Sequence, residues 1–224
     1  MTRDYQSERD RMVEFQIAGR GIRDERVLQA MRRVPRERFV DEHLARFAHD
    51  DGPLPIGAGQ TVSQPFMVAW MIEAAGVGPE DAVLEVGTGS GYAAAVLAQV
   101  AASVHSIERL EPLTRAARER LDALGYRDIH LRSGDGTLGW PEAAPFDAIL
   151  VAAAGPEVPA PLKQQLRLGG RLLMPLDLGA PGIEQQLLRV VRRAQDGFEQ
   201  EVLGGVAFVP LIGRHGWSED DERS

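Results

Sequence analysis

Three glycines at alternate positions, Gly87, Gly89 and Gly91, separate an apolar run (82–86) from an alanine-rich segment that begins at Tyr92. This pattern predicts a strand, a tight turn and a helix. Glycine adopts positive φ readily and lets a ligand approach the backbone with no side chain in the way. The start of the helix adds unpaired N–H groups and the positive end of the helix dipole. The segment therefore predicts a binding site for a nucleotide-like cofactor.

Two acidic residues near this turn distinguish between cofactors. The glycine spacing is G-x-G-x-G, whereas dinucleotide-binding turns have G-x-G-x-x-G. Glu85 lies two residues before the first glycine, where a carboxylate gives a pyrophosphate no stabilisation but suits the sulfonium and ammonium groups of S-adenosylmethionine (SAM). Glu108 ends the run SVHSIE and can accept hydrogen bonds from both ribose hydroxyls. The expected cofactor is SAM, and an NAD-dependent oxidoreductase is disfavoured.

The composition restricts the kinds of protein that this chain can be. A net charge of −8 disfavours a nucleic-acid partner, since phosphate binding requires a basic surface. No apolar run approaches the roughly 20 residues of a membrane helix, and the charged N-terminus lacks the apolar core of a signal peptide. The chain has no cysteine, which argues against disulfides and thiolate metal sites. We expect a cytosolic enzyme with no metal and no nucleic-acid or membrane partner.

The rest of the chain alternates between strand and helix patterns. Helical spacing up to about residue 40 is followed by a Gly- and Pro-rich loop over 47–65 and a helix over 65–75. Strands are then expected at 82–86, 103–107, 129–132, 146–152 and 171–175, with helices over 110–124 and 159–166, the latter ending near Gly169-Gly170. A hairpin formed by 186–193 and 202–210 closes the series around Asp196-Gly197.

This order of elements predicts the fold. Alternating strands and helices form a parallel sheet with helices on both faces, and the final hairpin adds one antiparallel strand. Seven strands so arranged resemble the class I SAM-dependent methyltransferase fold, an α/β, Rossmann-like architecture. We expect a single domain over 1–213, with N-terminal helices and a substrate loop (1–65) and a SAM-binding core (66–213). Residues 214–224 are predicted to be a flexible acidic tail.

A second motif, LPIGAGQTVSQP over 54–65, indicates a protein family when it is taken together with other segments. Taken alone, Ser63 has a simple explanation as the cap of the helix that begins at Pro65. Together with VLEVGTGSGY, GWPEAAPFDAILVAAA, GGRLLMPL and FVPL, however, the motif closely resembles the protein-L-isoaspartate O-methyltransferase family, over Met12 to Gly213. The resemblance implies SAM-dependent methylation of the free α-carboxylate of L-isoaspartyl and D-aspartyl residues in damaged proteins and peptides. The ester then closes to a succinimide, whose hydrolysis repairs the chain.

The resemblance also implies roles for individual residues. Ser63 is expected to contact the carboxylate that is methylated. The expected substrate-binding residues are Ile56, Gly57, Gln60, Thr61 and Val62. The expected cofactor-binding residues are Glu85, Gly87, Thr88, Gly89, Gly91, Glu108, Arg109, Asp135, Gly136 and Gln186. One position departs from the family pattern, since Ala152 stands where a threonine is frequent, and a hydroxyl is thereby missing beside the peptide site.

The expected chemistry needs no general base. An α-carboxylate with a pKa of about 3.3–3.7 is ionised at pH 7, so alignment of the reacting atoms is the main task. The five scattered histidines are accordingly interpreted as surface or strand-packing residues, Trp140 as part of a packed turn, and Trp70 as helix packing.

Other interpretations remain open at this point. The segment VAAAGP at the end of the fourth expected strand lacks the Asn/Asp-Pro-Pro-Tyr/Phe signature of amino-group methyltransferases. A related enzyme that methylates one aspartate of a biosynthetic peptide is the nearer alternative, and a catalytically silent SAM-binding module is another. Oligomeric state has no sequence signal, and a monomer is expected by default.

Overall fold

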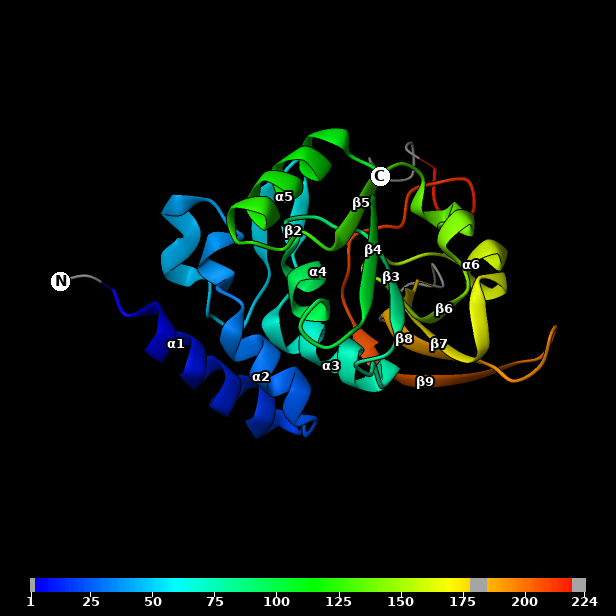
Figure 1. Cartoon of the computed structure of the whole chain (residues 1–224), viewed down its shortest axis with the longest axis horizontal. Helices are drawn as coiled ribbons and strands as arrows, with labels where there is room; N and C mark the ends of the chain where they lie inside the picture. The colour runs from blue at the N-terminus through cyan, green and yellow to red at the C-terminus, as the bar shows by residue number, and fades with distance from the viewer. Residues whose placement is uncertain (1–2, 178–184, 219–224) are drawn as a thin grey trace.

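A seven-stranded sheet forms the centre of the protein. The computed structural model describes residues 3–177 and 185–218 (Figure 1). The sheet has the order β5-β4-β3-β6-β7-β8-β9. Its strands are β3 (Ala82–Val86), β4 (Ser103–Glu108), β5 (Ile129–Ser133), β6 (Phe146–Val151), β7 (Leu166–Leu176), β8 (Gln185–Arg192) and β9 (Phe198–Val206). The predicted α/β fold with seven strands is therefore confirmed.

The order in which the chain adds its strands creates a switch point in the sheet. From β3 the chain builds outward through β4 to β5, then returns to place β6 on the other side of β3, and all these neighbours pair in parallel. Strand β8 is antiparallel to both β7 and β9, so it is the one antiparallel strand that the closing hairpin was expected to add. In open sheets of this kind, ligands bind beyond the carboxyl ends of the strands at the switch point, here between β3 and β6.

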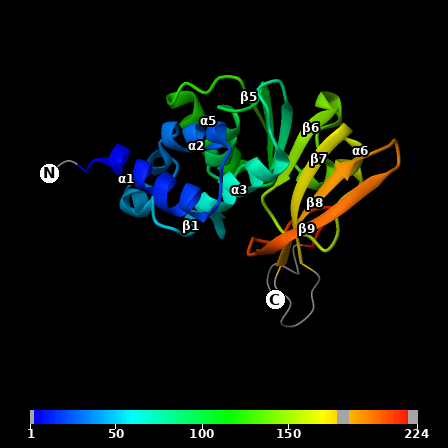
Figure 2. The ribbon, with the colours of Figure 1, turned by 90° about the horizontal axis from the view of Figure 1, so that it is seen from below.

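Helices cover the two faces of the sheet unequally. Their bounds are α1 (Tyr5–Arg11), α2 (Glu25–Arg33), α3 (Pro65–Ala75), α4 (Tyr92–Leu97), α5 (Glu111–Ala123) and α6 (Ala160–Gln164). Alternate strand residues divide between two buried clusters: Val83 and Leu173 pack with the N-terminal helices, α4 and α5, whereas Leu84 and Leu172 pack with α6. Figures 1 and 2 show α1 to α3 gathered on one side of the sheet and α6 on the other. No helix in the described parts of the chain is long and apolar enough to cross a membrane.

The N-terminal third is more structured than the sequence suggested. After α1 the chain forms a π-helix (Met12–Ile17) and, beyond α2, 3-10 turns at Arg36–Arg38 and Glu42–Phe47. The expected loop over 47–65 contains a small antiparallel hairpin of β1 (Leu54–Gly57) and β2 (Gln60–Val62). The loop prediction was therefore wrong in part, because positive φ at residues 57–59 makes a hairpin turn from the Gly-rich run.

Two boundaries near the C-terminus also differ from prediction. Strand β7 begins at Leu166, beside Phe146, and the glycines at 169 and 170 lie inside it at an irregularity of the β6–β7 register. Strand β9 begins four residues earlier than expected, because the turn after Arg192 closes directly onto Phe198. The predicted strand extended to residue 210 because residues 207–210 are apolar, whereas β9 ends at Val206.

Part of the predicted tail is folded. The backbone N–H of Arg214 donates to the Asp135 carboxylate at 2.8 Å, and the Trp217 indole donates to the Ala154 carbonyl at 3.1 Å. Residues 214–217 therefore form a turn against the segments that follow β5 and β6. Residues 219–224 lie outside the described residues.

Gly91 gives a test of how the turn before α4 is built. It has φ +90° and no room for a free Cβ, which would lie 3.3 Å from the Leu121 side chain of α5, whereas Gly125 has φ +84° and open space around it. We expect Gly91→Ala to lower the free energy of unfolding by about 2 kcal/mol and Gly125→Ala by about 1 kcal/mol, since both carry backbone strain but only the first also crowds a neighbour. Urea unfolding measures both, and equal losses would contradict the packing role of Gly91.

Candidate functional site

A cavity lies at the switch point, beyond the carboxyl ends of β3, β4 and β6. It contains about 770 Å³ of free space, part of it open to solvent. It is bounded by the end of β2, the glycine turn, the ends of the three strands and the segment after β9. Its lining comprises Gln60, Thr61, Val62, Ser63, Val68, Glu85, Val86, Gly87, Thr88, Gly89, Ser90, Tyr92, Ala93, Ile107, Glu108, Arg109, Gly136, Ala152, Ala153, Val209, Pro210, Leu211 and Ile212.

The glycine turn is held by internal hydrogen bonds. The N–H groups of Gly87 and Thr88 donate to the Ile107 carbonyl, and the N–H of Gly89 donates to the Glu108 carboxylate at 2.9 Å. The other oxygen of Glu108 accepts from the Leu110 N–H at 3.0 Å. These three N–H groups of the turn are therefore paired within the protein. A carboxylate already sits beside the turn, and it disfavours the phosphates of a dinucleotide.

Glu85 is the second acidic group of the cavity wall, and it is 2% exposed. The Ser106 hydroxyl donates to its carboxylate at 2.5 Å, and the Thr88 and Ser106 hydroxyls lie 2.6 Å apart. Burial raises the pKa of Glu85 to about 8, opposed by the Ser106 hydrogen bond and reinforced by the negative charge of Glu108. A cationic ligand group at this wall would relieve that repulsion.

Close backbone approaches explain two of the glycines. A Cβ at Gly136 would collide with the Val86 side chain, and one at Gly89 would lie 3.1 Å from the Ile56 side chain. A larger residue at either position would push these side chains out of place beside the cavity.

An apolar groove meets the cavity at the end of β2. Thr61, Ser63, Ala152 and Val209 line both. Beyond these residues the groove is bordered by α3 and by the chain after β9. Its other lining residues are Arg20, Pro53, Gln64, Phe66, Met67, Trp70, Gly205, Val206, Ala207 and Phe208. Two ligands, one in the cavity and one in the groove, would therefore meet beside Ser63.

Aromatic side chains line this groove. The rings of Phe66 and Trp70 stack with centroids 5.9 Å apart, and the Arg20 guanidinium lies 3.7 Å from the Phe66 centroid. Trp70 therefore lines the groove, whereas the sequence suggested only that it packs its helix. Trp140 instead packs against His105 at the end of a turn and lies outside the cavity lining, so its predicted packing role is confirmed.

The segment over 207–212 completes the cavity, and sequence reasoning gave it no role. Its backbone is fixed by the Ala154 N–H, which donates to Val209, and by the Leu211 N–H, which donates to Ala154. The Gln185 side chain forms two further hydrogen bonds with the backbone of Phe208. The FVPL motif was the available signal, since an apolar run with a proline directly after an edge strand favours a segment that leaves the sheet.

Eleven of the predicted site residues line the cavity. These are Gln60, Thr61, Val62, Ser63, Glu85, Gly87, Thr88, Gly89, Glu108, Arg109 and Gly136. Ile56 lies behind them with its side chain near Gly89, and Gly57 is exposed in the β1–β2 turn.

Three other predicted residues have structural contacts in place of a cavity position. Gly91 begins α4 and packs on α5. Asp135 caps the following 3-10 turn, and its carboxylate accepts hydrogen bonds from Thr137 and from the Arg214 N–H. Gln186 pairs with Leu176 and Gly205 inside the sheet. None of the three is in the cavity lining.

One histidine also departs from the sequence interpretation. His49 is buried at 6% exposure between Glu8 and Glu37, at 3.5 and 3.4 Å, and so is neither a surface residue nor part of a strand. His105 and His130 stack on neighbouring strands with ring centroids 4.6 Å apart, as strand-packing residues would.

The cavity fits SAM by its chemistry. Two carboxylates face the space where a cationic, ribose-bearing ligand would lie, and glycines form the wall that the ligand approaches. The sheet order, the single antiparallel strand and this turn define the class I SAM-dependent methyltransferases.

Comparison with known proteins gives the family. The model of the family "Protein-L-isoaspartate(D-aspartate) O-methyltransferase" matches residues 7–216, and the chain belongs to this family. It is 54% identical over 215 residues to protein-L-isoaspartate O-methyltransferase 2 of Pelobacter propionicus, covering 96% of this chain and 95% of the relative. It is 58% identical over 209 residues to a protein-L-isoaspartate O-methyltransferase of Methylorubrum extorquens, covering 93% of this chain and 90% of the relative.

Solved structures agree with this assignment. A protein-L-isoaspartate O-methyltransferase superimposes with a TM-score of 0.84 at 27% identity, covering 92% of this chain and 67% of that one. A Plasmodium falciparum structure, described as a putative enzyme of this kind, has a TM-score of 0.79 at 24% identity, covering 94% and 99%, and shows the shared fold.

The raised pKa of Glu85 gives a prediction on stability. The folded protein keeps a proton at Glu85 up to about pH 8, whereas the unfolded chain releases it near the ordinary glutamate pKa of 4.5. Because the folded state binds more protons between these values, the contribution of Glu85 to stability falls as the pH rises from about 5 to 8. We expect this loss, on the order of a few kcal/mol, to disappear in Glu85→Gln.

Urea unfolding at several pH values measures the effect, with the exposed Glu119→Gln as the matched control that should follow the wild type. Parallel curves for the wild type and Glu85→Gln would rule out a buried, protonated Glu85.

Proposed function

We propose that this chain transfers a methyl group from SAM to the free α-carboxylate of L-isoaspartyl and D-aspartyl residues in damaged proteins and peptides. The reaction begins their repair through a succinimide. Membership of the family carries the activity, and the junction of cavity and groove at Ser63 supplies the place where donor and acceptor would meet.

The residues of the cavity suit each part of SAM. Glu85, Gly87, Thr88 and Gly89 would hold the methionine part, whose positive charge would favour loss of the proton from Glu85. Glu108 would accept the ribose hydroxyls, because a carboxylate with two backbone partners retains free acceptor sites. When bound, SAM supplies a methyl group on a positively charged sulfur.

The remaining roles of Arg109, Gly136 and Gln186 follow from their positions. Arg109 and Gly136 line the cavity and would contact the ribose and adenine parts. Asp135 would affect the adenine part only indirectly, by capping the turn that begins with Gly136. Gln186 pairs inside the sheet and would contact the cofactor only if β8 shifted.

The acceptor needs orientation and no activation. Its carboxylate is ionised at neutral pH and is itself the nucleophile. Ser63, at the junction, would donate a hydrogen bond to one carboxylate oxygen and leave the other directed at the methyl carbon, while the apolar walls exclude water. Gln60, Thr61 and Val62 would position the substrate backbone, with Ile56 and Gly57 supporting the hairpin.

The groove suits a peptide of variable sequence. Its lining residues Phe66, Met67 and Trp70 are apolar, and backbone of the segment after β9 borders it. An extended chain could be held there through its backbone, so that the misplaced carboxylate, and not the flanking side chains, determines recognition. Ala152 removes one potential hydroxyl contact at the junction. Nothing in the described residues favours a dedicated biosynthetic peptide.

The activity is tested with two peptides that differ only in isoaspartate or aspartate at one position. We expect labelled methyl groups from SAM to appear on the isoaspartyl peptide alone and to be released by base, as a carboxyl ester requires. Equal labelling of both peptides, or label that base does not release, would contradict carboxyl methylation of isoaspartate.

The role of Ser63 is tested separately. Ser63→Ala should lower kcat/KM for the isoaspartyl peptide about 10- to 100-fold, since a hydrogen bond to a charged group is lost, and leave the Kd for S-adenosylhomocysteine within about twofold. Ser133→Ala, an exposed serine at the end of β5, is the matched control. Wild-type kcat/KM in Ser63→Ala would remove Ser63 from the mechanism.

We propose a cytosolic monomer that acts on proteins without a nucleic-acid or membrane partner, in keeping with the net charge of −8. Light scattering should give a mass of 24.5 kDa, and a value twice as large would show a dimer.

A further inference from the structure

Arg36 is the largest side chain among the fully buried ones of the described residues. It begins the 3-10 turn Arg36–Arg38 and is 0% exposed. A buried guanidinium is costly to hold unless it is paired and hydrogen-bonded, and an apolar residue of similar volume would fill the same space without that cost. The position therefore calls for an explanation beyond packing.

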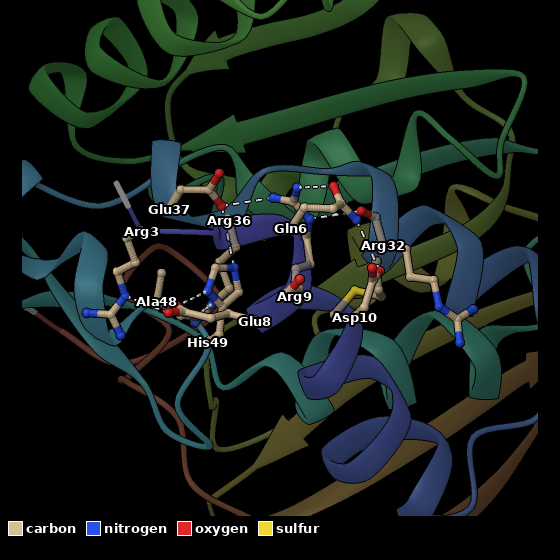
Figure 3. A network of polar contacts seen from close by, with 12 residues as sticks. Arg3, Gln6, Glu8, Arg9, Asp10, Arg32, Arg36, Glu37, Ala48 and His49 are labelled. Carbon is tan, nitrogen blue, oxygen red and sulfur yellow. Dashed lines mark hydrogen bonds and ion pairs between the residues drawn. The ribbon is translucent and has the colours of Figure 1, made fainter. Parts of the chain in front are cut away.

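No ion pair of Arg36 occurs within the described residues. The adjacent carboxylate, that of Glu37, is directed at Arg9, at 2.9 Å, and at His49, at 3.4 Å (Figure 3). The partners of Arg36 are instead neutral. Its Nε donates to the Ala48 carbonyl and one terminal nitrogen donates to the Ser63 carbonyl, each at 2.8 Å, while the Tyr92 ring lies 4.7 Å from its central carbon.

These partners belong to separate parts of the site. Ala48 ends the 3-10 turn before the β1–β2 hairpin, Ser63 joins β2 to α3, and Tyr92 is the first residue of α4 after the glycine turn. Ser63 and Tyr92 both line the cavity. A single planar group thus spans the acceptor side and the cofactor side of the site.

The hydrogen bond from Arg36 to the Ser63 carbonyl fixes the chain just before α3, where no side chain caps the helix. The N-terminus of α3 has Gln64 as its cap residue with no side-chain hydrogen bond, so Ser63 does not act as the helix cap. Since peptide groups are planar, fixing the Ser63 carbonyl fixes the rotation of the peptide bond that follows it. The orientation of the Ser63 backbone, and with it the direction of its side chain, therefore depends on Arg36.

We propose that Arg36 is a positioning residue for methyl transfer: through the Ser63 carbonyl it holds the Ser63 side chain toward the acceptor carboxylate. This proposal rests on the proposed function of Ser63. It depends on the planar fork of arginine, because a lysine ammonium keeps the charge but does not reproduce two donors aimed at two carbonyls. Positioning of this kind affects the rate of the reaction more than the binding of either ligand.

The test uses Arg36→Lys and Arg36→Met, each alone and combined with Ser63→Ala. We expect Arg36→Lys to lower kcat about tenfold, with KM for the isoaspartyl peptide and Kd for S-adenosylhomocysteine within about twofold. In the Ser63→Ala background the same substitution should lower kcat less than about twofold, because the side chain that it positions is absent. Arg36→Met serves as the second variant if the lysine variant fails to fold.

Arg171→Met is the matched control. Arg171 also donates to two backbone carbonyls, those of Ala75 and Gly76 at the far end of α3, but it has no contact with Ser63. It should leave kcat unchanged. Equal losses of kcat from Arg36→Lys in both backgrounds, or wild-type kcat in Arg36→Lys, would overturn the proposal.

Hydrogen exchange separates this proposal from the activity itself. With S-adenosylhomocysteine bound, Arg36→Lys should raise amide exchange over residues 61–66 and leave residues 82–86 at the wild-type rate. Unchanged exchange over 61–66 would overturn the positioning role whatever the substrate is. A wild-type enzyme that does not methylate the isoaspartyl peptide would instead refute the proposed function.

Discussion

The carboxylate of Glu108 closes the turn on which the site is built. By accepting the N–H groups of Gly89 and Leu110, it joins the glycine turn after β3 to the end of β4. The same carboxylate faces the cavity and determines the kind of ligand that fits there. A turn that donated its N–H groups to a phosphate would bind a dinucleotide, whereas a turn closed by a carboxylate favours a ligand with positive charge and hydroxyl groups.

The two halves of the chain contribute different parts of this site. The parallel strands supply a rigid wall for the cofactor, with Glu85 and Glu108 at the ends of neighbouring strands. The N-terminal third supplies the hairpin and Ser63, which face the acceptor groove. Arg36 connects the two parts, because it contacts both the Ser63 carbonyl and the Tyr92 ring at the start of α4.

The sequence predicted those parts that depend on local patterns. The strand at 82–86, the helix at 65–75 and the antiparallel strand followed from periodicity, glycines and turn signals. The cavity-lining role of Ser63 required the family resemblance as well, whereas that of Glu108 followed from its place at the end of the second expected strand. Local patterns did not predict the positions of residues that depend on contacts distant in the sequence. The Asp135 carboxylate accepts a hydrogen bond from the Arg214 N–H, and Gly91 packs against the Leu121 side chain.

Arg36 shows the same limit most clearly. In the sequence it is one of several arginines in a charged stretch after α2, and no local pattern marks it as buried. Its burial results from partners 12 and 27 residues away in the chain, at Ala48 and Ser63. Only the folded chain brings these groups together.

A crystal structure of the enzyme with S-adenosylhomocysteine and an isoaspartyl peptide would test the central claim, that donor and acceptor meet at Ser63. We expect the free α-carboxylate within hydrogen-bonding distance of the Ser63 hydroxyl, with the cofactor sulfur in the adjoining cavity and the peptide in the groove lined by Phe66. A peptide carboxylate bound away from Ser63, or a cofactor outside the cavity bounded by Glu85 and Glu108, would contradict this claim.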